Sequence, residues 1–366
     1  DALALGPGSC RAEFRCRLKL RADATCAVLE GGRAALRVEV EGEINLQPRF
    51  QLVGREAVLS DYNDARRLFR AGDDVRALQK CEEALALADT LTPRPHEMSD
   101  MFNLLGALHL RRNAPGLAVK CLDRALAIRA HKQRPDDCQM AMTINTLGNA
   151  HSALGNHTQA LVHHKRAVEL LGQTLTGDDL ILASALHSLG GTHRKLGNFA
   201  EARKCYERAL DIRQRTLGKE HPLNATTLNN LGAVMHQLTL HREAIACYQL
   251  ALAIVTKVYG PEHPNTAATL SNLGAAHGMV GEYQVAVDCH GHALAIYKGA
   301  SDPRVATTLH NLGNALAAAG RGRDAARCFW RALEMWSRSV GPAHPDVAAT
   351  LHSLGNVYRG LREAEA

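Results

Sequence analysis

The chain of 366 residues is poor in aromatic side chains, which make up 4% of it, and it contains no long apolar run. Although 46% of the residues are hydrophobic, much of that fraction is alanine, and no stretch approaches the roughly 18 apolar residues of a membrane span. We therefore expect a soluble, cytoplasmic protein without membrane insertion. Few rings are present on which bases could stack, and the net charge of +6 is dispersed, so we expect no nucleic-acid binding.

Motifs of common catalytic sites are missing as well. The sequence contains no GxxxxGK[ST] phosphate loop, no HExxH, no GxSxG, no GxGxxG and no CxxC. The regular helical positions described below have a structural explanation, which leaves few residues for a nucleophile, a base and an orienting group. We predict that the protein is not an enzyme and that it uses no cofactor and no metal.

A regularly spaced Leu-Gly pair is the most informative feature that the chain does have. Successive glycines of these pairs lie 42 residues apart, except for one interval of 39. The pairs are Leu105-Gly106, Leu147-Gly148, Leu189-Gly190, Leu231-Gly232, Leu273-Gly274, Leu312-Gly313 and Leu354-Gly355. Self-similarity at such a period is the signature of a solenoid built from repeated units.

Each unit reads as two amphipathic helices. An alanine followed by a branched apolar residue lies nineteen positions after each of the first six glycines, and apolar residues before and after it step by three or four. A glycine in mid-helix costs about 1 kcal/mol relative to alanine, so its recurrence indicates a steric need. We predict that Gly232 faces small residues such as Ala244 and Ala251 and lets the two helix backbones approach closely.

The connections between units carry helix start and stop signals. Gly218, Gly260 and Gly341 are placed to cap a helix C-terminus, and a proline four residues later can begin the next helix. The histidine before each of these prolines, in the sequences GKEHP, GPEHP and GPAHP, is expected to have a role in the turn.

These residues resemble the tetratricopeptide repeat, and the 42-residue period with phrases such as LGKEHPLNATTLNNLG is similar to the kinesin-light-chain type. One unit, NTLGNAHSALGNHTQALVHHKRAV, also resembles the repeats of the Gα- and spindle-adaptor family. The resemblance implies an all-α fold, a right-handed superhelical α-solenoid of helical hairpins. We expect it to span residues 55–366, as about seven hairpins plus a final capping helix, with a degenerate first unit in which Asp64-Ala65 replaces Leu-Gly.

Residues 1–50 differ from the rest, because polar and apolar residues alternate around 14–21 and around 38–44. That period of two predicts a short β-rich N-terminal segment. Such a segment either belongs to a larger upstream domain or packs on the end of the solenoid, and the absence of an initiating Met favours a fragment.

Cysteines and histidines also recur in register. Cys205, Cys247 and Cys289 belong to a column in the second helices, which predicts buried, reduced thiols, because neighbouring helices stand too far apart for disulfides. His109, His151, His193 and His277 lie three residues after a glycine, where exchange with Met, Leu and Tyr in other units favours a packing role. A zinc site among Cys10, Cys16 and Cys26 stays a weak alternative.

In the resembled family the first helices line a concave groove that binds peptides, at positions three before and one, four and five after the glycine. We infer that this groove binds an extended and acidic segment of a partner protein, since amides can bond its backbone and the middle of the groove is positive. The candidate residues are Asn103, Asn145, Asn149, His187, Arg194, Lys195, Asn229, His236, Met279, Asn314 and Asn356.

The resemblance implies a non-catalytic scaffold or adaptor, related to microtubule motors or the cytoskeleton. The alternative is a structural subunit held permanently in a large cytoskeletal or ciliary assembly. A third reading, the sensor arm of a signalling ATPase, requires a catalytic domain outside this sequence. The sequence does not identify the partner or separate the first two.

Overall fold

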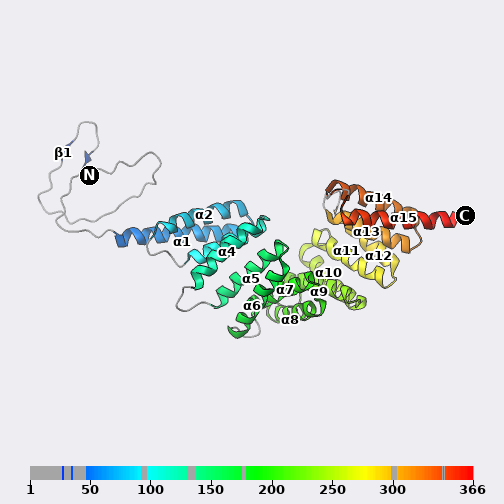
Figure 1. Ribbon diagram of the computed structural model, residues 1–366, viewed down its shortest axis with the longest axis horizontal. Coiled ribbons are helices and arrows are strands. Elements are labelled where there is room, and N and C mark those ends of the chain that lie inside the picture. The colour runs from blue at the N-terminus through cyan, green and yellow to red at the C-terminus, as the bar shows by residue number, and fades with distance from the viewer. Residues whose placement is uncertain are drawn as a thin grey trace. The chain divides into compact units, whose positions relative to one another are not determined.

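The computed structural model describes residues 27–28, 34–35, 47–91, 97–130, 137–174, 179–297, 303–339, 341 and 343–365. Contacts divide the chain into two units, residues 1–53 and 54–366. The described helices follow one another as pairs (Figure 1). They are α1 (Gln47–Ala71), α2 (Asp74–Asp89), α3 (Met98–Arg111), α4 (Pro115–Ala130), α5 (Asp137–Ala153), α6 (His157–Thr174), α7 (Leu180–Lys195), α8 (Phe199–Leu217), α9 (Pro222–Gln237), α10 (His241–Tyr259), α11 (Pro264–Met279), α12 (Tyr283–Tyr297), α13 (Pro303–Ala318), α14 (Gly322–Ser339) and α15 (Pro345–Glu365).

The second unit is a solenoid of helical hairpins. From α3 onward each odd-numbered helix packs along the even-numbered helix that follows it, and each even-numbered helix packs against the next hairpin. Consecutive odd-numbered helices from α3 to α15 also approach each other to within 8 Å between Cα atoms, whereas the even-numbered helices among the described residues do not. The odd-numbered helices therefore form the narrower, inner side of the stack.

The repeated glycine makes room for a side chain of the second helix. A Cβ at Gly232 would lie 2.8 Å from Cε1 of Tyr248, and one at Gly313 would lie 2.7 Å from Cε1 of Phe329. The residue met is always the one sixteen positions after the glycine, and the series is Leu122, His164, Tyr206, Tyr248, His290 and Phe329. The expectation that small residues face the glycine is thus only part of the account, because a large side chain, a ring in five of the six cases, fills the space.

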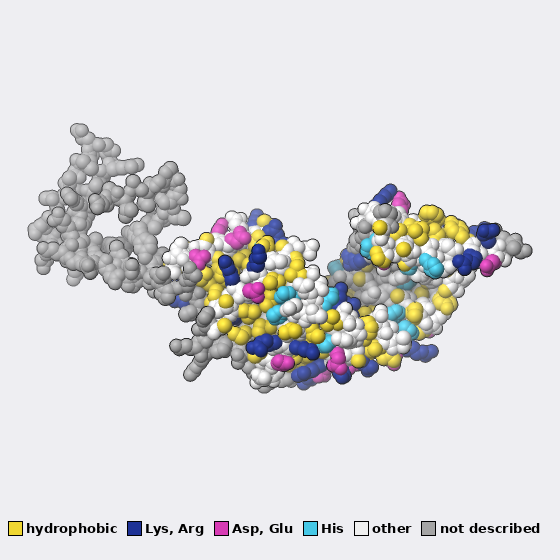
Figure 2. All heavy atoms as spheres, in the orientation of Figure 1, with side chains coloured by type: hydrophobic (Ala, Val, Ile, Leu, Met, Phe, Trp, Pro, Cys, Tyr) yellow, Lys and Arg dark blue, Asp and Glu magenta, His cyan; other side chains and the backbone are white. Residues whose placement is uncertain are grey.

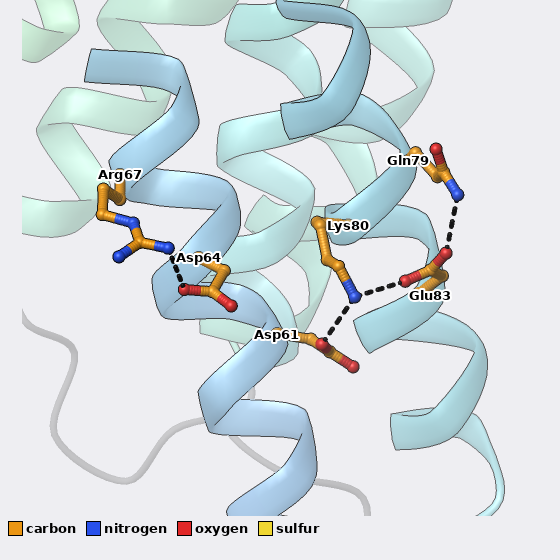
Figure 3. Close-up of polar contacts among 6 residues, drawn as sticks. All are labelled: Asp61, Asp64, Arg67, Gln79, Lys80 and Glu83. Atoms are coloured by element: carbon orange, nitrogen blue, oxygen red, sulfur yellow. Dashed lines mark hydrogen bonds and ion pairs between the residues drawn. The ribbon is translucent and has the colours of Figure 1, made fainter. Parts of the chain in front are cut away.

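The first hairpin, α1 with α2, lacks the glycine. Ala65 stands at the equivalent position and Cys81 lies sixteen residues later, and both are fully buried in one cluster. On the outside of this hairpin, Lys80 of α2 donates to Asp61 of α1 at 3.1 Å and to Glu83 at 2.8 Å (Figure 3). Such exposed pairs contribute little stability, so the apolar cluster holds this hairpin together.

The connections confirm the start and stop signals. Gly218, Gly260 and Gly341 have φ values of +82°, +93° and +88°, which favour glycine. The histidine before each proline is an N-cap residue, because its Nδ1 accepts a hydrogen bond from a backbone N–H two residues later: 3.2 Å for His221, 3.1 Å for His263 and 3.3 Å for His344. Histidine supplies here the acceptor that Ser, Thr, Asp or Asn usually provides.

The predicted short β-rich N-terminal segment is wrong. The only strands in the described part of the chain are Ala27–Val28 and Ala34–Ala35, an antiparallel pair of two residues each, and helix α1 begins already at Gln47. The alternating stretches around 14–21 and 38–44 lie outside the described residues. A pair of such short strands cannot make a stable sheet alone, and an alternating pattern predicts strands only where a partner covers the apolar face.

The cysteine column is free of disulfides. All described cysteines are free thiols, and those of the column are half-buried rather than fully buried. Burial raises the pKa of Cys205, Cys247 and Cys289, which lowers their thiolate fraction and their reactivity. No helix of the described part is both long and apolar enough to cross a membrane.

Candidate functional site

Three cavities open on the side of the solenoid formed by the odd-numbered helices, which we call the odd-helix face. Each is lined mainly by successive odd-numbered helices together with one even-numbered helix. Five of the eleven residues predicted to bind a peptide line these cavities, three more are exposed or half-buried on other helices or turns of the helices, and the remaining three form hydrogen bonds inside the stack. The cavities therefore divide the predicted residues into distinct environments.

The central cavity has a volume of about 350 Å³ and brings together His236 of α9, Met279 of α11 and Asn314 of α13. The Met279 side chain is 59% exposed. Most of the remaining lining is small or apolar and comes from α11, α12 and α13: Gly274, Ala275, Gly278, Tyr283, Ala286, His290, Asn311, Ala315 and Ala318. The small residues make the cavity and leave room for one bulky side chain of a ligand.

The cavity next to α15 has a volume of about 420 Å³ and joins Asn314 to Asn356. Both amides are exposed. Val357 and Leu361 of α15 and Phe329 of α14 supply its apolar wall. Asn314 thus lies between two cavities and can bond a chain that runs from one to the other.

The third cavity, about 410 Å³, contains Asn103 and is lined by α1, α3, α4 and α5. Sequence reasoning missed its other polar residues, among them Arg66, Asp100 and Arg129. A signal for Arg129 was present, because the residue four positions after the second-helix alanine is apolar in four of the six units. A charge in that column predicts a buried guanidinium.

Three of the predicted residues form hydrogen bonds within the stack. Oδ1 of Asn145 lies 3.0 Å from Nδ1 of His164, and Nδ2 of Asn229 donates to the Thr269 hydroxyl at 3.0 Å. Nε2 of His187 lies 3.2 Å from Nδ2 of Asn230 in the next unit. These side chains hold neighbouring helices together, whereas the sequence predicted that Asn145, His187 and Asn229 bind a peptide.

The positive charge in the middle of the face comes from Arg194 and Lys195. Burial, together with the nearby Arg213 guanidinium, lowers the pKa of His187 to about 4. Burial and the neighbouring His241 also lower the pKa of His236. Both imidazoles are neutral at pH 7. Lys195 is exposed, whereas Arg194 is half-buried and interacts with the Tyr206 hydroxyl.

The even-numbered helices show a different surface. In α8, Arg203 pairs with Glu207 at 2.7 Å and Lys204 with Glu201 at 2.8 Å, and all four side chains are exposed. Figure 2 shows basic and acidic side chains intermixed along the edge around α6 and α8, while histidines gather over the middle and C-terminal hairpins. Mixed, paired charges are typical of a solvated surface.

No group of three or more His, Cys, Asp or Glu side chains that could hold a metal ion occurs among the residues that the structure describes. The stacked pair His151 and His163, with ring centroids 5.2 Å apart, is therefore an aromatic contact between two helices of a hairpin. The zinc alternative at Cys10, Cys16 and Cys26 lies outside the described residues.

Comparison with known proteins matches the repeat itself. A family profile described as Tetratricopeptide repeat matches residues 181–249, 224–299 and 304–366, and a second profile with the same description matches residues 140–178. No curated protein matches the chain.

Solved structures share the fold. BtubC (BKLC) from P. vanneervenii is 25% identical, with 63% of this chain and 94% of that chain covered and a TM-score of 0.53. The repeats of a candidate kinesin light chain from Podosopora anserina are 23% identical, covering 55% of this chain and 96% of that chain, with a TM-score of 0.50.

A Signal Transduction ATPase with Numerous Domains from Pyrococcus horikoshii, which carries a tetratricopeptide repeat sensor, is 16% identical. The alignment covers 84% of this chain and 44% of that chain, with a TM-score of 0.61. The repeat hairpins, the glycine that receives a side chain of the second helix and the profile matches lead to one conclusion: the chain belongs to the tetratricopeptide repeat family, whose members act as protein-protein interaction scaffolds.

Proposed function

We propose that the chain is an adaptor that binds an extended segment of a partner protein along the odd-helix face, between α5 and α15. One observation carries the proposal: three successive odd-numbered helices, α9, α11 and α13, each contribute a predicted residue to the same cavity. A cavity lined by a few apolar and polar groups in a repeat array is a typical place for a ligand side chain.

The exposed side chains on this face suit an extended ligand with an acidic part. Asn149, Asn314 and Asn356 are exposed amides that both donate and accept hydrogen bonds, so they can bond a peptide backbone of any sequence. Lys195 and Arg194 attract carboxylates. The cavity beside Met279 takes the bulkiest apolar side chain of the segment.

A charge placed in the central cavity tests this proposal. Met279→Glu should abolish binding of peptides from an arrayed library, because it puts a carboxylate where an apolar side chain docks. The matched control is Leu250→Glu on α10, since Leu250 is apolar and 57% exposed but lies on an even-numbered helix. Equal loss in both variants, or in neither, contradicts binding at this cavity.

A second arm tests the charge of the segment. Lys195→Glu should weaken binding of acidic peptides, and added salt should weaken it further, because exposed ion pairs are screened over about 8 Å at physiological ionic strength. Arg208→Glu on α8 is the control on the other surface. If Arg208→Glu has the larger effect, the interface lies on the even-numbered helices.

Co-purification separates an adaptor from a fixed subunit. Partners of an adaptor should dissociate during washes at high salt, and they should be lost with Met279→Glu. A partner that stays bound through stringent washes and through Met279→Glu would identify the chain as a permanent subunit instead.

A further inference from the structure

The cavity lined by α1, α3, α4 and α5 contains a buried guanidinium that is only partly paired. The Arg129 side chain is 5% exposed, and its Nη2 donates to the Asp100 carboxylate. Its Nε and Nη1 are buried and have no hydrogen-bond acceptor in the part of the chain that the structure describes. Buried N–H groups without an acceptor are unfavourable, so such a group calls for an explanation.

An equivalent arginine in the same molecule has acceptors at Nη1, although its Nε, like that of Arg129, is buried without an acceptor in the described part of the chain. Arg213 stands at the same place two units later, and the two residues are similarly buried, with Arg213 5% and Arg129 4% exposed. Its Nη1 donates to the Thr227 hydroxyl at 2.5 Å and to the Leu223 carbonyl at 3.2 Å. Two groups of α9, in the next unit, thus accept hydrogen bonds from Nη1 of Arg213.

The groups equivalent to these two acceptors do not accept hydrogen bonds from Nη1 of Arg129. Thr143 corresponds to Thr227, and its hydroxyl donates to the Gln139 carbonyl at 3.0 Å. Neither group accepts a hydrogen bond from Arg129 Nη1. Because Arg129 lines a cavity, the missing acceptor can come from a ligand in that cavity.

The charges around the cavity favour an anion. Arg66 and Arg70 of α1 line it together with Arg129, and Asp100 is the only acidic residue among its described lining residues. Three guanidinium groups therefore face one carboxylate, which is already paired. Oδ1 of Asn103, in the same lining, is buried without a donor. A ligand that carries both a carboxylate and an N–H group supplies an acceptor for Arg129 and a donor for Oδ1 of Asn103.

Most of the remaining lining is apolar, apart from Gln139 and the Tyr62 hydroxyl. Phe69 of α1 and Leu104 of α3 form part of the wall, and Met142 of α5 is 43% exposed at the opening. These carbon surfaces suit an apolar side chain that lies next to the anionic group. The volume of about 410 Å³ is enough for one amino-acid residue with its neighbouring peptide group.

We propose that this cavity is a subsite for a carboxylate of the partner segment, bound by Arg129, with the N–H of the same residue donating to Asn103 and an apolar side chain beside Phe69 and Met142. The carboxylate belongs either to the C-terminus of the segment or to an acidic side chain within it. The assignment rests on the proposed binding of a segment to the odd-helix face. It places the carboxylate of that segment at the end of the face formed by α1, α3 and α5.

Small probes test the subsite without knowledge of the partner. The full chain is labelled with ¹⁵N-arginine, and the Nε–H resonances of Arg129 and Arg213 are followed during titration with N-acetyl-leucine, which has a carboxylate, an N–H and an apolar side chain. The neutral N-acetyl-leucine amide is the matched ligand control. N-acetylglutamic acid α-amide presents a side-chain carboxylate instead, so the stronger of the two acids identifies the source of the carboxylate.

We expect a saturable shift of the Arg129 resonance with at least one acid, about tenfold or more weaker binding of the amide, and no shift of Arg213, since the ligand supplies a charge-assisted hydrogen bond only at Arg129. Arg66→Gln with Arg70→Gln, on the exposed surface of α1, should weaken the acid and leave the fold intact. Equal binding of acid and amide, or a shift at Arg213 alone, would overturn the subsite.

The two proposals fail in different ways. If the subsite is wrong but the odd-helix face binds a segment, peptide capture survives Arg66→Gln with Arg70→Gln and is still lost with Met279→Glu. If the face binds no segment, N-acetyl-leucine still shifts Arg129, and neither set of substitutions changes capture.

Discussion

The first hairpin and the later ones solve the same packing problem with opposite pairs of residues. In α1 and α2, Ala65 is packed near a small residue, Cys81, whereas in α9 and α10 Gly232 receives the ring of Tyr248. Interiors are close-packed, so the volume of one position limits that of the other. The repeat is therefore defined by the first-helix position together with the residue sixteen positions later, rather than by the glycine alone. Glycine is required at the first position where a ring lies at the second.

The largest expected effect comes from filling the occupied position. Gly232→Leu should lower the free energy of unfolding by about 3 kcal/mol, because its side chain overlaps the Tyr248 ring in a packed interior. Hydrogen exchange should increase mainly in α9, α10 and their neighbours, since contacts in a solenoid are local.

Gly355→Leu is the matched control. No atom lies within 4 Å of a Cβ at Gly355, so this leucine should be neutral or slightly stabilising through its higher helix propensity. A comparable loss in both variants, or loosening spread evenly over the chain, would contradict the local packing.

A second test compares the rings themselves. His164 and His290 occupy the position of Phe329, and burial lowers the pKa of each to about 4, aided for His164 by the nearby His163. Because the folded-state pKa is below the unfolded value near 6.5, each neutral imidazole contributes stability above pH 6.5 that is lost as the pH falls toward 4.

Each of these two histidines should lower the free energy of unfolding by about 2 kcal/mol when the pH falls from 7 to 5. Urea unfolding at both pH values should show a smaller difference in His164→Phe and in His290→Phe. His292→Phe, at an exposed position in α12, should leave the pH dependence as it is. An unchanged dependence in all three variants would show that the buried rings do not govern it.

A third test converts a later hairpin to the pairing of the first. Gly232→Ala should destabilise the protein when Tyr248 is present, but it should be harmless or favourable in a Tyr248→Cys background, because Ala65 is found with Cys81. The double-mutant cycle should give a coupling energy of about 1–2 kcal/mol. Additive effects would mean that the two positions are independent and that the first hairpin is only degenerate.

The smallest expected effect concerns the connections. His263→Ala should cost about 1 kcal/mol or less, because it removes the acceptor for the backbone N–H of Asn265 at the start of α11. Hydrogen exchange should rise in the first turn of α11, and His263→Asn should restore protection. If exchange rises elsewhere instead, the histidine acts through the Tyr259 ring on which it stacks.

The helices were predictable because each unit repeats the same signals. The Leu-Gly pair, the second-helix alanine and the Gly-to-Pro connections fix helices such as α9 and α10, and the structure confirms them. What contacts the glycine was not predictable from small residues alone: Tyr248 lies on the same helix face as Ala244 and Ala251, and only the packing shows which side chain fills the space.

The candidate site was less predictable than the fold. The family positions identify the correct helices, but they do not show which polar side chains are engaged in the stack, and so Asn145, His187 and Asn229 could not be separated from Asn314 by spacing. Protonation was a second obstacle. His187 reads as a possible cation in the sequence, and its burial beside Arg213 makes it neutral.

The contacts between hairpins have a mechanical consequence. Among the described residues, each hairpin from α3 onward contacts its immediate neighbours, and both of its helices pack against the odd-numbered helix of the next unit. Even-numbered helices of successive units make no contact with each other in the described part of the chain, so a pull that opens the stack on their side has to break their contacts with the next odd-numbered helix. These contacts between each even-numbered helix and the next odd-numbered helix therefore limit how far tension on the chain ends can open the stack and widen the cavities.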